Sequence, residues 1–224
     1  MSIQLLIIFL SIIISFAVQS GMQRAYNKYL GEMTARGLNG YQVASMFLQE
    51  NGVHDVSFDL MPGQLADHYD PATKTIRLSK DIYYGTSIAS VAIACHEAGH
   101  ALQHAKGYTL LAIRNRLIPT VQVASSLSWI CIFIGLLSGL LNVLIIGIVA
   151  LGIIAIFQLV TLPIELNASN QALAFLDSTI LNEDEHDGAK KVLRAAAFTY
   201  IAALVISLMQ IARFLLIIMN SRRR

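Results

Sequence analysis

The longest apolar feature of the chain is residues 117–164, a run of 48 positions without Asp, Glu, Lys, Arg or His. As one helix this run would be about 72 Å long at 1.5 Å per residue, whereas the hydrocarbon core of a bilayer is about 30 Å thick. The run is therefore predicted to cross a membrane twice. Small and polar residues interrupt it at 138–142, which places the crossings near 119–138 and 143–163.

Two further apolar segments lie near the ends of the chain. Residues 3–18 carry only three polar residues and lack the basic residues that precede a signal-peptide core, so they predict a retained membrane anchor. Residues 196–219 are long enough for another crossing, and Arg213 is close enough to its end to extend toward the interface. The fold class predicted is mainly α, a multi-pass helical membrane protein with about four spans.

These spans divide the chain into five predicted parts. They are an anchor at 1–19, a polar α+β segment at 20–118, a transmembrane hairpin at 119–163, a polar helical segment at 164–195, and a transmembrane helix with a basic tail at 196–224. Because two crossings separate the two polar segments, both are predicted on the same side of the membrane, with both termini on the other side.

Basic residues near the span ends predict the orientation. The side of the polar segments carries Arg24, Lys28, Arg36, Arg114, Arg116, Lys190, Lys191 and Arg194, and the other side carries chiefly Arg222, Arg223 and Arg224. The positive-inside bias predicts a multi-pass protein of the cell membrane whose polar segments face the cytosol. The terminal arginine triplet favours the opposite orientation.

The polar segment 20–118 shows both helical and strand periodicity. Apolar residues recur at helical spacing over 40–50, and apolar and polar residues alternate at 56–60 and 75–78. This pattern predicts one helix and then two strands that flank turn-rich sequence at 67–71. A second helix is predicted to begin after Thr86 or Ser87, which can cap it, and to end near Ala105.

The composition agrees with a membrane protein. The chain is 55% hydrophobic and 13% charged with a mean hydropathy of +0.60, whereas soluble domains carry about 25% charged residues. A net charge of +2 with no basic stripe outside the last three residues argues against nucleic-acid binding. Cys95 and Cys131 are too few for a disulfide framework.

The predicted second helix contains His96-Glu97-Ala98-Gly99-His100, an HExxH arrangement. Histidines four residues apart lie about 40° apart around a helix and about 6 Å along it, so their imidazoles can converge on one cation. Glu97 can then reach a water molecule beside that cation. Zinc is the metal expected for two neutral imidazoles, and a catalytic site takes three protein ligands. The alternative is a helix face with two histidines and no metal.

The position of the next carboxylate restricts the third ligand. The extended metzincin pattern is excluded because the positions that need Gly and His carry Gln103 and Lys106. No carboxylate occurs between Ala101 and Ile164, so Glu165 is the first one available, on the side predicted for the HExxH helix. Glu165 also begins a predicted helical stretch, where a lone carboxylate can simply favour the helix dipole.

Other histidines and acids are weaker candidates. His104 is about 12 Å along the helix from His96, too far to share its metal, and is predicted to lie outside the ligand set. His68 and Tyr69 are candidates for stabilising an oxyanion, although they also fit a plain turn. The acidic run Glu183–Asp187 fits a solvated N-terminal turn of a helix better than a metal site.

Several motifs together, in order along nearly the whole chain, resemble the YugP family of bacterial membrane zinc metallopeptidases. They are Ala66–Pro71, Thr75–Ser79, His96–His104, Leu162–Ser169, Gly188–Leu193 and Ala196–Tyr200. The resemblance implies a membrane-bound neutral zinc peptidase with a small zincin-like HExxH domain at the membrane surface. It implies His96, His100 and Glu165 as zinc ligands and Glu97 as the catalytic base.

A more distant resemblance links Glu165 and Ala168 to the Glu-x-x-Ala-Asp segment of HtpX-like membrane proteases. Those proteases carry Asp after the Ala, where this chain has Ser169. The orienting role of that carboxylate is therefore not carried over to this chain.

The first hypothesis is a zinc metalloendopeptidase that cleaves membrane-associated proteins or peptides with a metal-activated water and Glu97 as general base. The strand near Thr75–Ser79 is predicted to pair with an extended substrate. Expected partners are the substrate, the bilayer and, as an open alternative, a regulatory membrane protein. The second hypothesis is a non-catalytic scaffold or regulator with a structural zinc. The third is a site-2-type intramembrane protease using Asp187, which the polar residues of 80–105 and the polar setting of Asp187 oppose.

Overall fold

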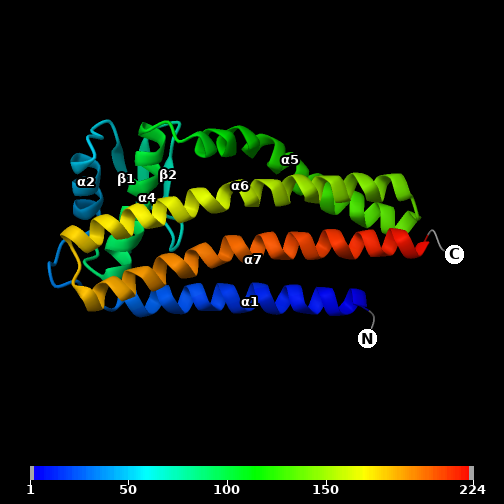
Figure 1. The fold of residues 1–224 in the computed structure, drawn as a ribbon, viewed down its shortest axis with the longest axis horizontal. Helices are drawn as coiled ribbons and strands as arrows, with labels where there is room; N and C mark the ends of the chain where they lie inside the picture. Colours follow the sequence, from blue (N-terminus) through cyan, green and yellow to red (C-terminus); the bar gives the residue numbers. More distant parts are fainter. Residues whose placement is uncertain (1–2, 222–224) are drawn as a thin grey trace. The chain divides into compact units, whose positions relative to one another are not determined.

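The computed structural model describes residues 3–221 and is mostly helical, with a small sheet (Figure 1). Its elements are α1 Ile3–Leu30, α2 Gly40–Glu50, β1 Ser57–Met61, β2 His68–Asp70, β3 Thr75–Ser79, α3 Lys80–Tyr83, α4 Ile88–Ala105, α5 Thr109–Ser138, α6 Leu141–Thr179 and α7 Glu183–Ser221. The chain divides into two compact units. The first unit comprises residues 1–19, 112–162 and 198–224, and the second comprises 20–111 and 163–197.

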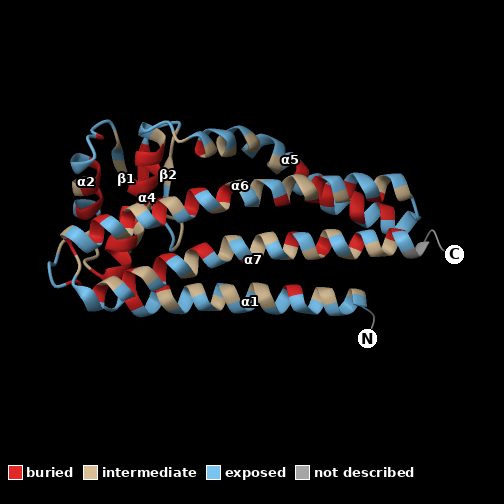
Figure 2. Cartoon of the chain, in the orientation of Figure 1, coloured by how far each residue is buried: buried red, intermediate tan, exposed pale blue. Residues whose placement is uncertain are grey.

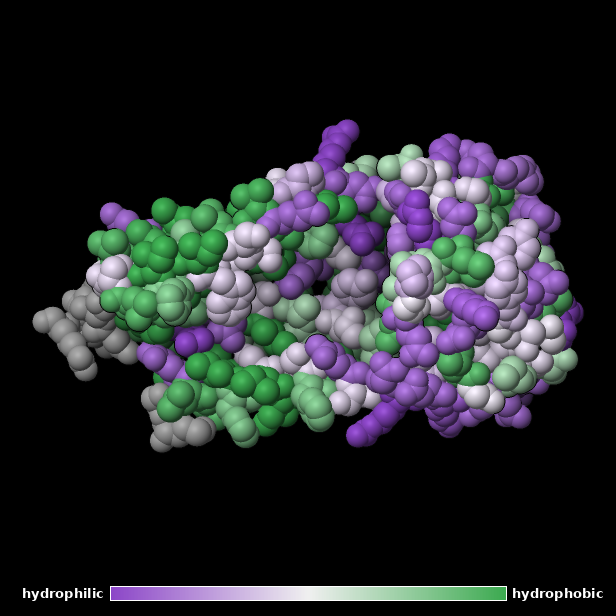
Figure 3. Space-filling model, turned by 180° about the vertical axis from the view of Figure 1, so that it is seen from behind, coloured by the Kyte–Doolittle hydropathy of each residue, from purple (hydrophilic) through white to green (hydrophobic). Residues whose placement is uncertain are grey.

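The first unit consists of parts of four apolar helices. Within the described residues, α1, α5, α6 and α7 are each long and apolar enough to cross a membrane, so there is one candidate helix for each of the four predicted spans. Many of their large apolar side chains are exposed, and Figure 3 shows hydrophobic residues gathered over one end of the visible face. The predicted hairpin turn is confirmed, since α5 ends at Ser138 and Gly139 adopts a φ of +69° before α6 begins. The basic tail Arg222–Arg224 lies outside the described residues.

Helix α6 is longer than predicted. It continues from the apolar run through Pro163 to Thr179 without interruption, so the expectation that Glu165 begins a helix is wrong. A proline in a helix removes one backbone hydrogen bond. Here the helix continues because its next turns are packed, with Ile164, Ala168 and Ala172 all fully buried. Glu165 is therefore fixed within a helix, close to the point where α6 enters the second unit at Pro163.

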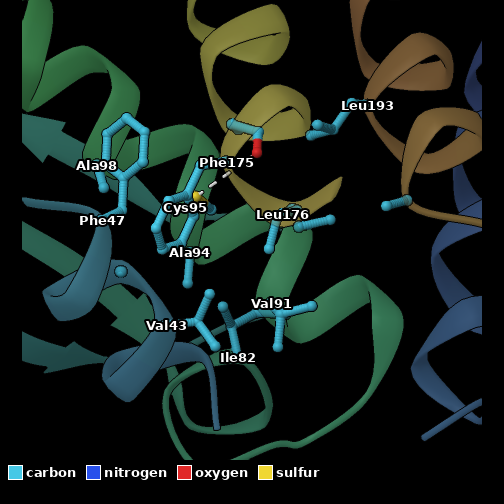
Figure 4. Close-up of a cluster of buried hydrophobic side chains, with 14 of the residues drawn as sticks. Val43, Phe47, Ile82, Val91, Ala94, Cys95, Ala98, Phe175, Leu176 and Leu193 are labelled. Atoms are coloured by element: carbon cyan, nitrogen blue, oxygen red, sulfur yellow. Dashed lines mark hydrogen bonds between the residues drawn. The ribbon is translucent and has the colours of Figure 1, made fainter. Parts of the chain in front are cut away.

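The second unit is built around α4, of which 14 of 18 residues are buried (Figure 2). Ser87 caps this helix as predicted, because its Oγ accepts a hydrogen bond from the Ser90 N–H. Figure 4 shows Phe47 of α2 and Phe175 of α6 packed beside α4, with ring centroids 5.2 Å apart in an edge-to-face arrangement. The predicted helix at 40–50 is confirmed as α2.

The sheet has the strand order β1-β3-β2. The two predicted strands correspond to β1 and β3, which pair in parallel. The sequence does not indicate β2, because residues 67–71 carry turn chemistry. This strand pairs antiparallel with β3 and is tied down by Arg77, which forms an ion pair of 2.8 Å with Asp70.

The position of β3 corrects one prediction about substrate binding. Residues Thr75–Ser79 form the central strand, and both of its edges already pair with strands of this sheet. An additional strand cannot be added to β3. Among the described strands, β2 pairs with β3 alone and presents an outer edge, and it is also the strand that contacts α4 through hydrogen bonds from Tyr69.

Candidate metal centre

Three predicted site residues meet between α4 and α6 in the second unit. The Nε2 atoms of His96 and His100 lie 3.3 Å and 3.5 Å from the same carboxylate oxygen, Oε2 of Glu165. Among the described residues these three side chains form a cluster whose ligand atoms all lie within 4.8 Å of one another. Glu165 and His100 are buried, and His96 is half-buried.

The donor set and its spacing fit a zinc ion. Zinc bonds to imidazole nitrogen and carboxylate oxygen are about 2.0–2.1 Å long, and two ligands of a tetrahedral ion are then about 3.3 Å apart. The two observed Nε2 to Oε2 distances of 3.3 Å and 3.5 Å match this spacing. Two histidines and one carboxylate also leave the fourth position open, as in a catalytic rather than a structural site.

Each histidine has a hydrogen-bond partner behind its ring. Nδ1 of His96 lies 3.1 Å from Oγ of Ser169, and Nδ1 of His100 lies 3.0 Å from Oε1 of Gln103. When Nε2 is the metal ligand, Nδ1 carries the proton and donates a hydrogen bond to such a partner. Ser169 and Gln103 therefore orient the two rings so that both Nε2 atoms face Glu165.

Gln103 also connects the histidine helix to the helix of the third ligand. Its Nε2 donates hydrogen bonds of 2.9 Å to the backbone oxygen of Ile164 and to Oδ1 of Asn167. Ile164 is adjacent to Glu165 in the chain, so one buried amide contacts a metal-site histidine on α4 and the backbone beside the metal-site carboxylate on α6. Any displacement of α6 along α4 would break these bonds.

The HExxH sequence itself permits the close approach of the two helices. A Cβ atom placed on Gly99 would lie 2.9 Å from the backbone oxygen of Ala168 and 3.3 Å from its Cβ. Ala168 is one helical turn after Glu165, and both residues face α4. The small residues Gly99 and Ala168 therefore set how near the carboxylate comes to the two imidazoles.

Glu97 follows His96 in α4 and lies close enough to His96, His100 and Glu165 to interact with them electrostatically. It is 8% exposed, and its Oε2 accepts a hydrogen bond of 3.0 Å from the backbone N–H of Tyr69 in β2. Burial raises the pKa of the Glu97 carboxyl above its ordinary value, against the lowering effect of His96 and His100. The Glu97 carboxylate is thus held at the site without being one of the three clustered ligand groups.

The weaker candidates lie away from the cluster. His104 Nδ1 is 2.8 Å from the hydroxyl of Tyr69, and His68 Nδ1 is 2.9 Å from the backbone oxygen of Ala66. The acidic run forms the first turn of α7 as predicted, but it is not solvated throughout, because Glu185 is buried and accepts a hydrogen bond from the Ala35 N–H. None of these groups contributes to the three-residue cluster among the described residues.

Comparison with known proteins places the chain in a family. Residues 4–219 match the sequence profile of a family described as "Putative neutral zinc metallopeptidase". The chain belongs to this family. A curated relative in Bacillus subtilis (strain 168), named "Putative membrane protease YugP", is 39% identical over 222 residues, covering 97% of this chain and 99% of the relative. No solved structure matches.

The sequence did not identify the hydrogen-bond partners of His96, His100 and Glu97 in this member of the neutral zinc metallopeptidase family. Gln103 stands three residues after His100, a spacing that puts it on the same helix face, and that was the available signal. For Ser169, the sequence shows only that it departs from the HtpX-like pattern, which gives no hint of its hydrogen bond to His96. The Tyr69 N–H carries no signal in the sequence, because it is a backbone group.

Replacing Gly99 with Ala is expected to weaken zinc binding by about tenfold, because the added Cβ forces α6 away from α4 and separates Glu165 from the histidines. Isothermal titration with zinc checks this. Gly152→Ala is the matched control, since a Cβ on that α6 glycine meets nothing within 4 Å. Equal affinity in the Gly99→Ala protein would show that the close approach is not needed for the site.

Replacing Gln103 with Leu is expected to lower zinc affinity by about 10- to 100-fold, because both the His100 partner and the bonds to α6 are lost. Gln103→Glu keeps an acceptor for His100 but loses the two amide donors, so a smaller loss is expected. Competition with a fluorescent zinc chelator measures both. Gln49→Leu, on the exposed face of α2, is the control, and an unchanged affinity in Gln103→Leu would remove Gln103 from the site.

Proposed function

We propose that this protein is a multi-pass membrane zinc metalloendopeptidase that hydrolyses peptide bonds of membrane-associated proteins or peptides. One observation carries the proposal: a single oxygen of Glu165 lies 3.3 Å and 3.5 Å from the Nε2 atoms of the two HExxH histidines. The Glu97 carboxyl group interacts electrostatically with all three groups. The family description and the name of the Bacillus relative support the same class of reaction.

The proposed chemistry assigns one role to each residue. His96, His100 and Glu165 would hold a zinc ion, which when bound supplies a Lewis acid that polarises the scissile carbonyl and lowers the pKa of water toward neutrality. The carboxylate of Glu97 takes a proton from the attacking water and passes it to the nitrogen of the leaving amine. Ser169 and Gln103 keep the imidazoles in the tautomer that presents Nε2.

The sheet and the four apolar helices support the proposed substrate and its location. An extended peptide would pair with the outer edge of β2, since β3 has no free edge. The four apolar helices support contact with the bilayer and hence with substrates at or in the membrane. We place the second unit at the cytosolic surface of the cell membrane, because of the basic residues near the span ends. A regulatory membrane protein is a further proposed partner.

Two alternatives fit the structure less well. A scaffold with a structural zinc would normally close the site with a fourth protein ligand and would not need Glu97, whereas the cluster in the described residues has three ligand groups. A site-2-type protease would carry HExxH within the bilayer, but α4 is not among the described helices long and apolar enough to span it. Asp187 is likewise absent from the described cluster.

Glu97→Gln is expected to retain zinc at one ion per chain and to lose peptidase activity by at least about 100-fold, the weight of general-base catalysis. Glu165→Ala is expected to lose most of its zinc, since two imidazoles alone hold the ion weakly. Metal analysis of the detergent-purified proteins and cleavage of β-casein measure both. Glu183→Gln, an acid in the first turn of α7, is the control, and full zinc occupancy in Glu165→Ala would remove that residue from the ligand set.

Removing metal with EDTA is expected to lower the thermal stability of the wild-type protein, because a ligand that binds only the folded chain stabilises it by about 4 kcal/mol at 1,000 times its Kd. Adding zinc back should restore the unfolding temperature. Differential scanning fluorimetry checks this, and the Glu165→Ala protein serves as the comparison because its unfolding temperature should respond little to zinc. A zinc response of equal size in both proteins would argue that the stabilising ion binds elsewhere.

A further inference from the structure

The backbone N–H of Tyr69 occupies an unusual position in the sheet. Tyr69 is the middle residue of β2 and lies opposite Ile76 of β3 in the antiparallel register. Its N–H is not used for that pairing, because it donates to Oε2 of Glu97 on α4 at 3.0 Å. The outer strand of the sheet is thus bonded directly to the carboxylate proposed as the general base.

The geometry of an antiparallel pair fixes the direction of the Tyr69 carbonyl as well. Residues directly opposite each other either exchange both backbone hydrogen bonds or exchange neither. Since the Tyr69 N–H goes to Glu97, the pair of Tyr69 and Ile76 exchanges neither. The N–H and the C=O of Tyr69 both face away from β3, toward the outer edge of β2. They are the two groups that an added extended peptide would use.

A peptide bound at β2 and Glu97 would therefore compete for one hydrogen-bond donor, the Tyr69 N–H. The N–H of Tyr69 is the only donor that this residue offers at the outer edge, and the Glu97 carboxylate already accepts it. A peptide carbonyl can accept the same hydrogen bond at full strength only after the carboxylate has released it. Binding of the peptide at β2 and loss of the hydrogen bond between the Tyr69 N–H and Glu97 therefore occur together.

We propose that an extended peptide bound along β2 takes the Tyr69 N–H from Glu97 and so frees the carboxylate to act as base only when a substrate is in place. This inference rests on the proposed peptidase function and adds a mechanism by which peptide binding regulates the catalytic base. In the absence of a peptide, Glu97 stays bonded to the strand. Peptides that cannot adopt an extended conformation at β2 leave the base engaged.

The side chain of Tyr69 allows the exchange without movement of the strand. Its hydroxyl lies 2.8 Å from Nδ1 of His104, which is seven residues after Glu97 and about 10 Å farther along α4. Tyr69 is therefore attached to α4 at two separate points. When the amide changes partner, the pairing with β3 still holds β2 in register, and the contact with His104 still links it to α4.

The first test observes the Tyr69 amide by NMR in metal-free, detergent-solubilised protein labelled with 15N-tyrosine, assigned with a Tyr69→Phe variant among the eight tyrosines. Without peptide, the Tyr69 amide proton is expected downfield in the wild type and upfield in Glu97→Ala. With saturating oxidised insulin B chain, the two proteins are expected to show the same Tyr69 shift, because the peptide carbonyl is then the acceptor in both. Shifts that stay different with the peptide bound would overturn the exchange.

The second test is a double-mutant cycle on the affinity for oxidised insulin B chain, again without metal so that no cleavage occurs. Glu97→Ala is expected to tighten binding by about tenfold in the wild-type and Tyr69→Ala backgrounds, because the peptide no longer displaces the carboxylate. In the Tyr69→Pro background, which lacks the N–H, the same substitution is expected to change nothing. Tightening of equal size in all three backgrounds, or none in the first two, would contradict the proposal.

These tests separate the exchange from the peptidase assignment. Neither uses zinc or cleavage, so they give a result even if Glu165→Ala retains zinc. The NMR measurement in wild type and Glu97→Ala also gives a result if the proline variant fails to fold. A protein that cleaves β-casein but keeps the Tyr69–Glu97 bond in the peptide complex would retain the proposed function and lose this inference.

Discussion

The site depends on the close packing of α4 against α6 at Gly99 and Ala168. Hydrogen at the Gly99 α-position leaves room for the backbone of Ala168, and a methyl group there would meet the Ala168 oxygen at 2.9 Å. One turn before this contact, Glu165 brings its Oε2 within 3.5 Å of both imidazoles. Metal ligands must be placed to within a few tenths of an ångström, so this helix-to-helix distance decides whether the three groups can share an ion.

The same packing explains why a helix rather than a loop supplies the third ligand. Ile164, Ala168 and Ala172 form a buried stripe on α6 at the helical spacing of four, and Glu165 is adjacent to that stripe. Its carboxylate oxygen therefore has little freedom once the stripe is packed. Gln103 restrains the two helices further through polar contacts. Its side-chain amide donates hydrogen bonds of 2.9 Å to Ile164 O and Asn167 Oδ1, and these would break if α6 moved along α4. The predicted ligand residues are brought together by a rigid pair of helices.

The sequence was sufficient for features that depend on local pattern and length. The four apolar helices, the hairpin near Gly139, helix α2 and the Ser87 cap all follow from hydrophobic spacing and capping chemistry. The pairing of Glu165 with the HExxH histidines was predicted from the absence of any earlier carboxylate, and the structure places these groups together. Such inferences need only the order of residues along the chain.

Features that depend on which helices and strands contact one another in the folded chain could not be predicted from the sequence. Strand β2 has only three residues, and its Asp67–Pro71 surroundings carry turn chemistry, so its strand identity comes from pairing with β3. That pairing in turn makes β3 central and invalidates the predicted substrate edge. The continuation of α6 through Pro163 is likewise a result of packing on the turns that follow, which outweighs the local helix-breaking tendency of proline. In both cases tertiary contacts override a local preference.

The neutral groups behind the histidines fit the charge of the site. Zinc would bring two positive charges into a region where Glu165 and Glu97 are both at most 8% exposed, and two carboxylates balance that charge. Ser169 stands where HtpX-like proteases carry Asp, and an Asp there would add a third negative charge to a buried site, which is costly unless it is paired. A hydroxyl at 3.1 Å from His96 Nδ1 still accepts a hydrogen bond from the ring N–H. Ser169 and Gln103 thus orient the histidines without adding a third negative charge to the two carboxylates.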